Sequence, residues 1–231
     1  MFEINKIYCA DCIEFLKGLP DNSVDFILTD PPFNVGLEYA DTDDNMSDGE
    51  YSEWCFKWLN ELYRVLQSGC YAIIFTGDIK LFYIMSAIYK TNFMFHHFLK
   101  WNKPGSQSHL RGTVLFCTTE LAFILSKEKP NIKKINKHIL YSDTIKIKSN
   151  NKRDVDAVEH KASRPVKLYK QIIEGFNANI TLDCFMGSGT TAIACKELNK
   201  NFIGCDISKK YVEMANKRLS NLKLNKKLID F

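Results

Sequence analysis

The chain has 231 residues, of which 45% are hydrophobic and 25% charged, and its formal net charge is +4 at pH 7. This composition supports a sizeable core and excludes a globally disordered chain. No run approaches the roughly 18 apolar residues of a membrane span, and charged residues interrupt the early apolar runs, so no signal peptide is expected. The eight cysteines lack the spacing of a disulfide framework, which favours a reducing, cytoplasmic location. The length fits one α/β domain with an embellishment, or two small domains.

Charge is distributed unevenly along the chain. Residues 1–60 contain three Lys and thirteen Asp or Glu, whereas residues 127–170 contain thirteen Lys or Arg and five acids. Such asymmetry is typical of a protein that meets a polyanion with one face. A lysine-rich solvated surface is the alternative, and charge alone does not choose between the two.

Strands and helices are predicted to alternate along the first half of the chain. Apolar runs predict strands at residues 4–9, 24–29, 70–76, 93–101 and 120–126. Helical spacing and capping signals predict helices from the N-cap Asp11 to Gly18, at residues 51–67, which Gly69 closes, and at residues 79–89. Residues 34–50 are acidic and show no periodicity, so we interpret them as a loop that lies where a lid would be.

The pattern changes at residue 127 and returns at residue 165. Between these points lysines multiply, and only short β-prone pieces occur, at residues 139–141 and 144–147. We interpret this segment as an insertion that carries specificity. Regular elements then follow, with helices predicted at residues 165–176, 190–199 and 209–219 and strands at residues 180–183 and 202–206.

The first candidate site is Asp30-Pro31-Pro32-Phe33. It follows the apolar run 24–29, which predicts a buried strand of a parallel sheet. The two prolines end that strand because neither donates a backbone hydrogen bond. A carboxylate, a rigid carbonyl and an aromatic ring then lie at the carboxyl end of a strand, where open α/β sheets bind ligands. This combination suits a planar target that carries an amino group.

The second candidate site runs from Asp183 to Thr191 and reads Asp-Cys-Phe-Met-Gly-Ser-Gly-Thr-Thr. It predicts a strand, a tight glycine turn and the start of a helix. Glycines permit close approach of a ligand to the backbone, and the next strand ends at Asp206, where a carboxylate accepts hydrogen bonds from a ribose diol. No Gly-Lys-Ser/Thr follows the turn, so a P-loop is excluded.

The order of the motifs along the chain distinguishes between the nucleotide ligands that this glycine turn could bind. Gly187, Gly189 and Ala192 satisfy the dinucleotide fingerprint. A classical dinucleotide fold, however, needs a second mononucleotide half, and the chain ends 25 residues after Asp206. The carboxylate of Asp183 would repel a pyrophosphate but hold the ammonium of an amino acid. These features favour S-adenosylmethionine over a nicotinamide dinucleotide.

Together these motifs resemble those of the amino-group DNA methyltransferases, most closely the permuted β class, in which the catalytic motif precedes the glycine motif. Asp30-Pro31-Pro32-Phe33 looks like the catalytic Asp-Pro-Pro-Tyr/Phe of that family, and Asp183 to Thr191 looks like its cofactor motif. Ala10-Asp11-Cys12 is similar to the turn that cradles the cofactor adenine. The segment His160-Lys161-Ala162-Ser163-Arg164-Pro165 is similar to the family's His-Pro-Thr-Gln-Lys-Pro segment, with Arg164 keeping the positive charge.

The resemblance implies a single Rossmann-like α/β methyltransferase fold with a mostly parallel seven-stranded sheet, permuted motif order and a small basic target-recognition insert. The catalytic and cofactor domain would comprise residues 1–101 and 161–231, including the strand at 120–126, and the recognition region would be approximately residues 102–160. The implied cofactor-binding residues are Ala10, Asp11, Cys12, Arg164, Pro165, Asp183, Phe185, Met186, Gly187, Ser188, Gly189, Thr190 and Asp206.

The resemblance also implies a reaction, in which S-adenosylmethionine methylates adenine N6 in a specific DNA sequence after the base flips out of the duplex. Asp30, Pro31, Pro32 and Phe33 would be catalytic. Cytosine N4 is the main alternative, and a nicotinamide-dependent oxidoreductase is a weaker one. Double-stranded DNA is the expected partner, with a homodimer and a cognate restriction endonuclease as further possibilities.

Outside these motifs, a few basic residues are candidates for contacts with DNA. They are His109, Arg111, Lys133 and Lys134. Cys9 and Cys12 have the spacing of half a zinc or redox site, but no second pair at ligand spacing accompanies them. We therefore expect no metal.

Overall fold

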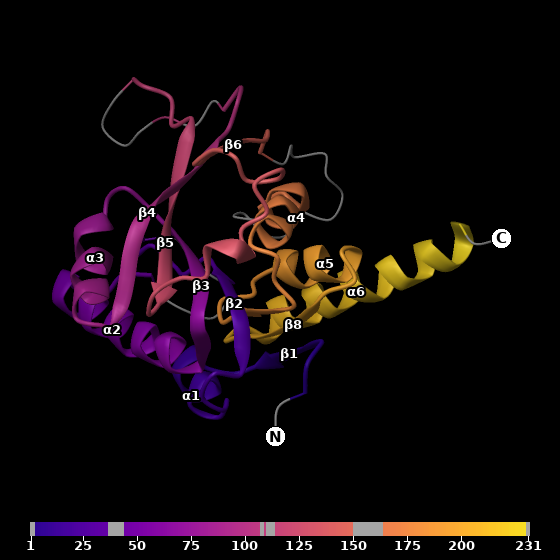
Figure 1. The fold of residues 1–231 in the computed structure, drawn as a ribbon, viewed down its shortest axis with the longest axis horizontal. Helices are drawn as coiled ribbons and strands as arrows, with labels where there is room; N and C mark the ends of the chain where they lie inside the picture. The colour runs from indigo at the N-terminus through magenta and orange to yellow at the C-terminus, as the bar shows by residue number, and fades with distance from the viewer. Residues whose placement is uncertain (1–2, 37–43, 107–108, 110–113, 150–163, 230–231) are drawn as a thin grey trace.

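The computed structural model describes residues 3–36, 44–106, 109, 114–149 and 164–229, and its elements alternate much as the sequence predicts (Figure 1). The strands are β1 (Lys6–Cys9), β2 (Val24–Thr29), β3 (Leu66–Thr76), β4 (Phe93–Asn102), β5 (Thr119–Lys127), β6 (Thr144–Lys146), β7 (Ile180–Asp183) and β8 (Asn201–Asp206). The helices are α1 (Cys12–Lys17), α2 (Asp48–Val65), α3 (Leu81–Tyr89), α4 (Val166–Gly175), α5 (Thr190–Glu197) and α6 (Lys209–Ile229), and a 3-10 turn spans Ile132–Lys134.

The described strands form one sheet of eight strands rather than the predicted seven. Their order is β1-β8-β7-β2-β3-β5-β4-β6. β5 is antiparallel to both of its neighbours, and the other pairs are parallel. The additional strand is β6, a short piece of the lysine-rich insertion that pairs with the end of β4. The prediction of a mostly parallel α/β sheet is confirmed, and the insertion lengthens the sheet.

Helices cover both faces of the sheet (Figure 1). Side chains alternate along each strand, so Ile27 of β2 packs with α1, α2 and α3, whereas Phe26 and Leu28 pack with α4, α5 and α6. Burial on both faces explains why β2, β3 and β8 read as continuous apolar runs. Within the described chain, no helix has the length and hydropathy to cross a membrane.

Caps and turns set the helix ends, and both ends of α2 and the end of α6 differ from the predictions. α6 continues to Ile229, ten residues beyond its predicted end. Asp11 caps α1 as expected, since its carboxylate accepts from the backbone N–H of Ile13 and Glu14. A capping box between Ser47 and Glu50 starts α2 at Asp48, before the predicted start. The prediction that Gly69 ends this helix is wrong, because α2 already ends at Val65 and Gly69 lies inside β3.

Strand order reverses between β7 and β2, two neighbours in the centre of the sheet. β2 leads through α2 to β3 on one side, whereas β7 leads through α5 to β8 on the other. The loops that follow β2 and β7 therefore diverge, and the crevice between them is the usual ligand site of an open α/β sheet. The two candidate motifs are the segments that begin these loops.

Candidate active site

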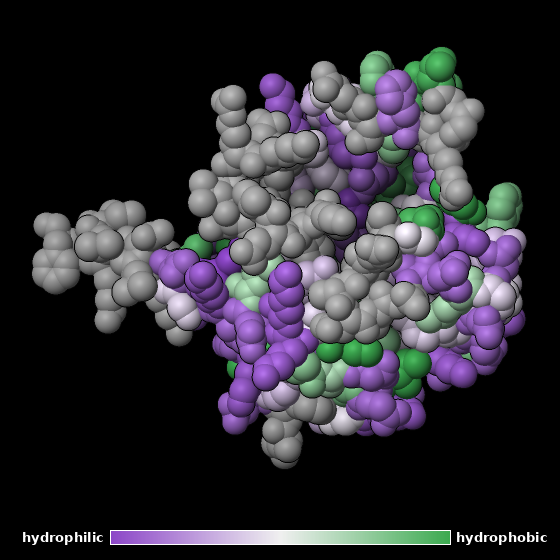
Figure 2. Space-filling view, turned by 180° about the vertical axis from the view of Figure 1, so that it is seen from behind, coloured by the Kyte–Doolittle hydropathy of each residue, from purple (hydrophilic) through white to green (hydrophobic). Residues whose placement is uncertain are grey.

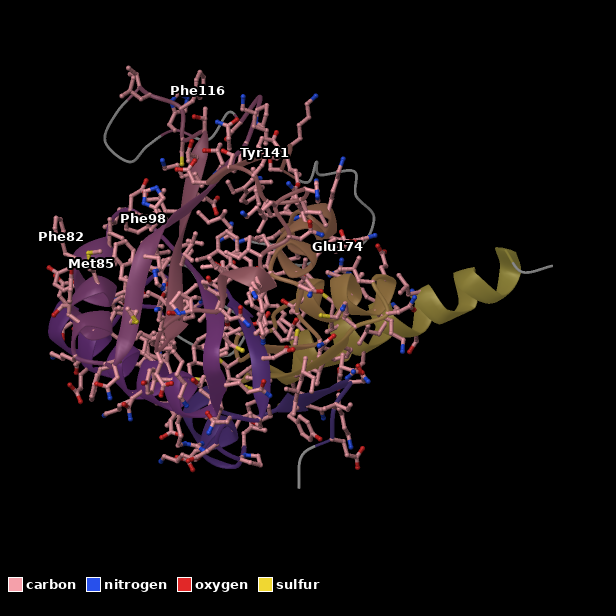
Figure 3. All side chains as sticks on the ribbon, in the orientation of Figure 1. Phe82, Met85, Phe98, Phe116, Tyr141 and Glu174 are labelled. Carbon is pink, nitrogen blue, oxygen red and sulfur yellow. The ribbon has the colours of Figure 1, made fainter. Side chains whose placement is uncertain are left out.

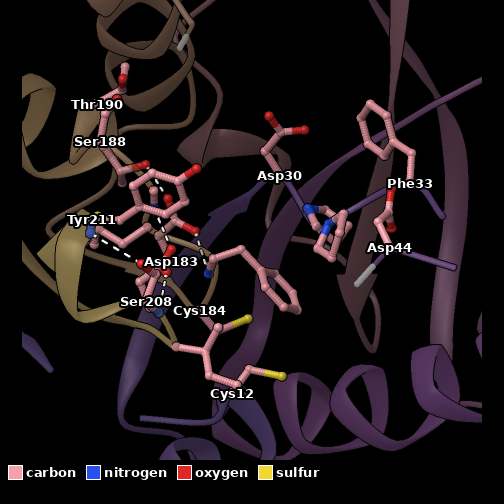
Figure 4. Close-up of a pocket in the computed structure, with 18 of the residues that line it drawn as sticks. Cys12, Asp30, Phe33, Asp44, Asp183, Cys184, Ser188, Thr190, Ser208 and Tyr211 are labelled. Atoms are coloured by element: carbon pink, nitrogen blue, oxygen red, sulfur yellow. Dashed lines mark hydrogen bonds between the residues drawn. The ribbon is translucent and has the colours of Figure 1, made fainter. Parts of the chain in front are cut away.

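A cavity of about 420 Å³ lies in this crevice (Figure 4), within the usual size range of ligand pockets. Most of the residues that the sequence predicts for catalysis or cofactor binding line it: Asp11, Cys12, Asp30, Pro31, Pro32, Phe33, Arg164, Asp183, Phe185, Met186, Gly187, Ser188, Thr190 and Asp206. Segments from the beginning and the end of the chain thus meet at one cavity.

Three residues of the predicted set lie beside the cavity instead of lining it. The Ala10 N–H donates to the Asp206 carbonyl at 3.1 Å, and Pro165 is the N-cap of α4. Gly189 has a φ of +84°, and a Cβ there would lie 2.7 Å from the Cβ of Ala215. These residues hold the lining segments in place, and Gly189 brings the glycine turn close to α6.

The turn after β2 is fixed by bonds from later parts of the chain. The Tyr51 hydroxyl of α2 donates to the Pro32 carbonyl at 3.1 Å. The buried Asp44 accepts from the Asn34 N–H at 2.7 Å and from the Val35 N–H at 2.9 Å. The backbone on both sides of Phe33 is therefore held in place.

Asp30 is paired with Arg164, which comes from the segment before α4. Arg164 donates from Nε to Asp30 Oδ2 and from Nη2 to Asp30 Oδ1, both at 2.7 Å. Burial raises the pKa of the Asp30 carboxyl, and the guanidinium opposes that shift. Burial also works against the charge of Arg164, but Asp30 and Glu120 together raise its pKa, so it stays protonated.

Asp183, at the end of β7, has neutral partners. It accepts from the Thr29 hydroxyl at 2.7 Å, from the Phe185 N–H at 3.1 Å and from the Thr191 hydroxyl. Burial raises its pKa to about 6, against which these hydrogen bonds act. Both carboxylate oxygens thus tie β2 and α5 to β7. The structure gives Asp183 this bracing position, whereas the sequence suggested only an ammonium partner.

The glycine turn is held by its neighbours on α6 and β8. Gly187 has a φ of +50°, and its N–H donates to Asp206 Oδ2 at 2.7 Å. The other Asp206 oxygen accepts from the Ser208 N–H at 2.9 Å. Arg218 of α6 donates to the Ser188 carbonyl at 2.6 Å. No sequence pattern predicted the position of Arg218, which depends on how α6 packs.

The charge of the cavity indicates what kind of ligand fits it. Among the described lining residues there are five carboxylates and one guanidinium, and that guanidinium is paired with Asp30. The carboxylates are those of Asp11, Asp30, Asp44, Asp183 and Asp206. A pyrophosphate would be repelled here, whereas a ligand that carries an ammonium and a sulfonium would be attracted. This donor set fits S-adenosylmethionine.

The candidate DNA contacts lie in different places. His109 pairs with Phe116 in an isolated bridge of the segment joining β4 to β5, on the same sheet edge as the cavity. Lys133 and Lys134 belong to the 3-10 turn, and Lys134 Nζ contacts the Cys70 sulfur near the beginning of β3, which is the opposite edge. The structure does not bring these lysines to the cavity. Arg111 and residues 160–163 lie outside the described residues.

Sequence reasoning missed two residues beside Asp30. Glu120 accepts from Arg164 and, at 2.6 Å, from Lys103 Nζ. The only signal was a carboxylate at the start of an otherwise apolar predicted strand. Tyr51 is also missed, because its helical spacing indicates core packing, although its hydroxyl reaches the Pro32 carbonyl.

A family model described as DNA methylase, of the N6/N4 methyltransferase type, matches residues 24–217. The chain belongs to this family. The methylase is 31% identical to the Type II methyltransferase M.HpaI of Haemophilus parainfluenzae, over 94% of this chain and 74% of that protein. It is 30% identical to the Type II methyltransferase M1.MboII of Moraxella bovis, over 97% of this chain and 100% of that protein.

Solved structures agree with this assignment. The crystal structure of the M1.HpyAVI–SAM complex superposes with a TM-score of 0.65 at 27% identity and covers 92% of the methylase and 98% of that chain. The cytosine-N4-specific PvuII DNA methyltransferase gives a TM-score of 0.74 at 19% identity, over 91% of the methylase and 84% of that chain, and thus shares the fold. The methylase is an S-adenosylmethionine-dependent enzyme that acts on DNA.

Proposed function

We propose that the enzyme methylates adenine N6 within a specific DNA sequence, on a base rotated out of the duplex. The observation that carries the proposal is that the Asp30 turn and the Gly187 turn line one cavity at neighbouring strand ends. The preference for adenine rests on the resemblance, since Asp rather than Ser before Pro-Pro is usual in its adenine enzymes. Cytosine N4 is the alternative that the test must separate.

In this proposal Asp30 and the Pro31 carbonyl accept the two hydrogens of the target amine. An exocyclic amine is a poor nucleophile because its lone pair is delocalised into the ring, and two acceptors favour a pyramidal nitrogen. An ionised carboxylate has about four lone-pair sites. The bidentate contact with Arg164 uses one site on each oxygen of Asp30, so sites for the amine are left.

Phe33 is proposed to stack on the flipped base. Stacking of this kind contributes about 1–3 kcal/mol per base. The ring is placed by the Tyr51 contact to Pro32 and by close packing against Gly77. Because positioning supplies much of the catalysis in a transfer between two bound molecules, the rigid turn matters as much as the ring.

The cofactor would be held by the opposite wall. Asp206 is proposed to bind the ribose, Asp11 and Cys12 to flank the adenine, and the turn at Gly187 to hold the methionine portion. When bound, S-adenosylmethionine supplies an electrophilic methyl group on its sulfonium. The carboxylates of Asp11, Asp183 and Asp206 on that wall are proposed to stabilise the positive charges of the bound cofactor.

The DNA-facing surface is proposed to include the segment between β4 and β5 within the recognition region 102–160. Its described tip carries exposed apolar side chains at Val114, Leu115 and Phe116, and Figure 3 shows Phe116 and Tyr141 pointing outward at the same end of the molecule. Figure 2 shows hydrophobic atoms at the same end of the molecule. A cognate restriction endonuclease is supported by relatives named as type II methyltransferases, and a homodimer stays a prediction.

The test is analysis of the methylated nucleoside. The protein is incubated with DNA and methyl-labelled cofactor, and the DNA is digested to nucleosides. Labelled N6-methyladenine is expected from the wild type and none from the Asp30→Ala variant. Labelled N4-methylcytosine would show that the target base is cytosine and not adenine. Absence of label from all nucleosides would refute the proposal.

A further inference from the structure

Four charged side chains from four segments form a continuous chain that ends at the cavity, which Arg164 and Asp30 line. Lys103 donates to Glu120 at 2.6 Å, Glu120 accepts from Arg164 Nη1, and Arg164 holds both oxygens of Asp30 at 2.7 Å. The side chains of Lys103 and Arg164 are each only 9% exposed. The set has two positive and two negative charges, so it is balanced while Asp30 is ionised.

The guanidinium of Arg164 is also enclosed by aromatic rings. Its central carbon lies 4.5 Å from the ring centroid of Phe75, 5.4 Å from that of Trp101 and 6.0 Å from that of Phe33. Such cation–π contacts strengthen when the cation is desolvated. Since Nε, Nη1 and Nη2 each donate to a carboxylate, both the position and the rotation of the guanidinium are fixed.

This arrangement differs from the cofactor contact that the sequence suggested for Arg164. The guanidinium lies on the β2 and β5 side of the cavity, against Asp30 and Glu120, whereas the cofactor wall follows β7 and β8. A planar fork matched to a carboxylate fixes the plane of that carboxylate as well as attracting it. A lysine at this position would supply charge without that constraint.

We propose that Arg164, anchored by Glu120 and Lys103, is a positioning residue that sets the plane of the Asp30 carboxylate and keeps it ionised to accept the target amine. The proposal rests on the proposed role of Asp30. The fork of Arg164 places one hydrogen bond on each Asp30 oxygen, and the remaining lone-pair sites serve the two-acceptor arrangement. Glu120 accepts a hydrogen bond from Arg164 Nη1, so the guanidinium is shared between two carboxylates. This sharing weakens the attraction between Arg164 and Asp30.

The groups that face Asp30 set the expected pH dependence. They are Arg164 before α4, Glu120 on β5, the buried Tyr169 on α4 and Asp183 on β7. Of these, Arg164 supplies the positive charge. Loss of that charge should raise the pKa of Asp30 further, because an opposite charge at contact distance lowers the pKa of a carboxyl group. The acidic limb of the pH–rate profile should then move upward equally.

The decisive experiment compares Arg164→Met with Arg164→Lys in single-turnover methyl transfer from pH 5 to 9. For Arg164→Met we expect the acidic limb to move up by about 1–3 pH units, so that at a fixed pH on that limb the rate falls by about 10- to 1,000-fold. Arg164→Lys keeps the positive charge beside Asp30, so the acidic limb of its pH–rate profile should stay in place. Because lysine lacks the planar fork of the guanidinium, the maximal rate of this variant should be lower than that of the wild type. Calorimetry should give a dissociation constant for S-adenosylmethionine within about threefold of wild type for both variants.

Two further variants keep the test decisive if Arg164→Met does not fold. Glu120→Gln removes a negative charge near Asp30, so the acidic limb should move to lower pH, the direction opposite to Arg164→Met. Arg64→Met is the matched control, because Arg64 forks onto Asp21 and Glu61 far from the cavity. The Arg64→Met variant should be less stable than the wild type, and the acidic limb of its pH–rate profile should stay at the wild-type position.

Two outcomes would overturn the inference: an unmoved limb in Glu120→Gln and in folded Arg164→Met, or weakened cofactor binding as the main effect of both Arg164 variants. The second outcome would mean that Arg164 binds the cofactor, as the sequence implied. Turnover that survives in Asp30→Ala would instead refute the proposed role of Asp30, so the two failures are distinguishable.

Discussion

Two aspartates end neighbouring strands at the centre of the sheet, Asp30 after β2 and Asp183 at the end of β7, and their surroundings differ in kind. Asp30 is held by a charged guanidinium, whereas Asp183 is held by two hydroxyls and a backbone N–H. Asp183 is 2% exposed, and the Asp30 side chain is 18% exposed and borders the open cavity.

This difference indicates that the Asp183 carboxylate holds neighbouring elements together, whereas the Asp30 carboxylate is available for the reaction. Neutral hydrogen bonds on both oxygens of Asp183 tie β2 and α5 to β7. The charge-assisted fork on Asp30 uses one site on each oxygen, leaves further lone-pair sites for a ligand and stabilises the ionised form. The two aspartates occupy similar positions on neighbouring strands but have different roles: Asp183 stabilises the fold, and Asp30 is available to a ligand.

The largest effect should come from Asp30→Ala. We expect turnover to fall by at least about 1,000-fold, within the range for loss of a group that handles a proton at the reacting atom, while the cofactor dissociation constant stays nearly unchanged. Single-turnover methyl transfer and calorimetry measure the two quantities. Activity above about a tenth of wild type would contradict the contrast between the two aspartates.

Asp183→Ala should act first on stability. It leaves the hydroxyls of Thr29 and Thr191 and the Phe185 N–H without their acceptor, and hydrogen bonds to a charged group contribute about 1.5–3 kcal/mol each. Because such losses overlap, we expect the free energy of unfolding to fall by about 3–5 kcal/mol in urea titrations. Thr29→Val, which removes one bond, is the control and should cost about 1–2 kcal/mol. A loss below about 1 kcal/mol for Asp183→Ala would show that the bracing is unimportant.

The pKa of Asp183 gives a smaller, pH-dependent effect. Burial raises it from 3.8 to about 6, so between these values the folded protein holds a proton that the unfolded chain has released. This group therefore stabilises the fold most below about pH 4, and its contribution is lost as the pH rises through 6. Relative to Asp183→Asn, the wild type should lose about 3 kcal/mol of unfolding free energy between pH 4 and 7. A difference that is flat or rises with pH would contradict the burial of this carboxyl.

The sequence predicted both motifs because each depends on local rules. Prolines stop β2 at Asp30, glycines permit the turn after Asp183, and the apolar runs between turn signals predict buried parallel strands. The order of motifs along the chain was enough to predict the permuted α/β fold, which the sheet order confirms.

The partners of Asp30 were not predictable in the same way. Glu120 and Lys103 reach Arg164 only because β5 inserts antiparallel between β3 and β4, and no local pattern specifies such an insertion. The count of lysines near residue 130 did not reveal their position either, because Lys134 lies near the beginning of β3, at the sheet edge opposite the cavity. Long-range pairing decides these positions.

The smallest effect we predict tests how closely the Asp30 turn is packed. A Cβ added at Gly77 would lie 3.0–3.3 Å from ring and Cβ atoms of Phe33, so the ring must shift by a few tenths of an ångström. We expect Gly77→Ala to lower kcat/KM for DNA by about 2- to 10-fold, a fraction of the roughly 1–3 kcal/mol that stacking contributes. Gly49→Ala is the control, because a Cβ there meets no atom within 4 Å.

A double-mutant cycle assigns this effect to the ring. If Gly77 acts through Phe33, the loss caused by Gly77→Ala should vanish in a Phe33→Ala background, and the two changes should be non-additive by the full size of the smaller effect. Additive losses would mean that Gly77 acts through the backbone of β3 instead. The Asp183 side of the cavity, which has no such aromatic contact with Gly77, should be indifferent, so cofactor binding should stay at the wild-type value in all three variants.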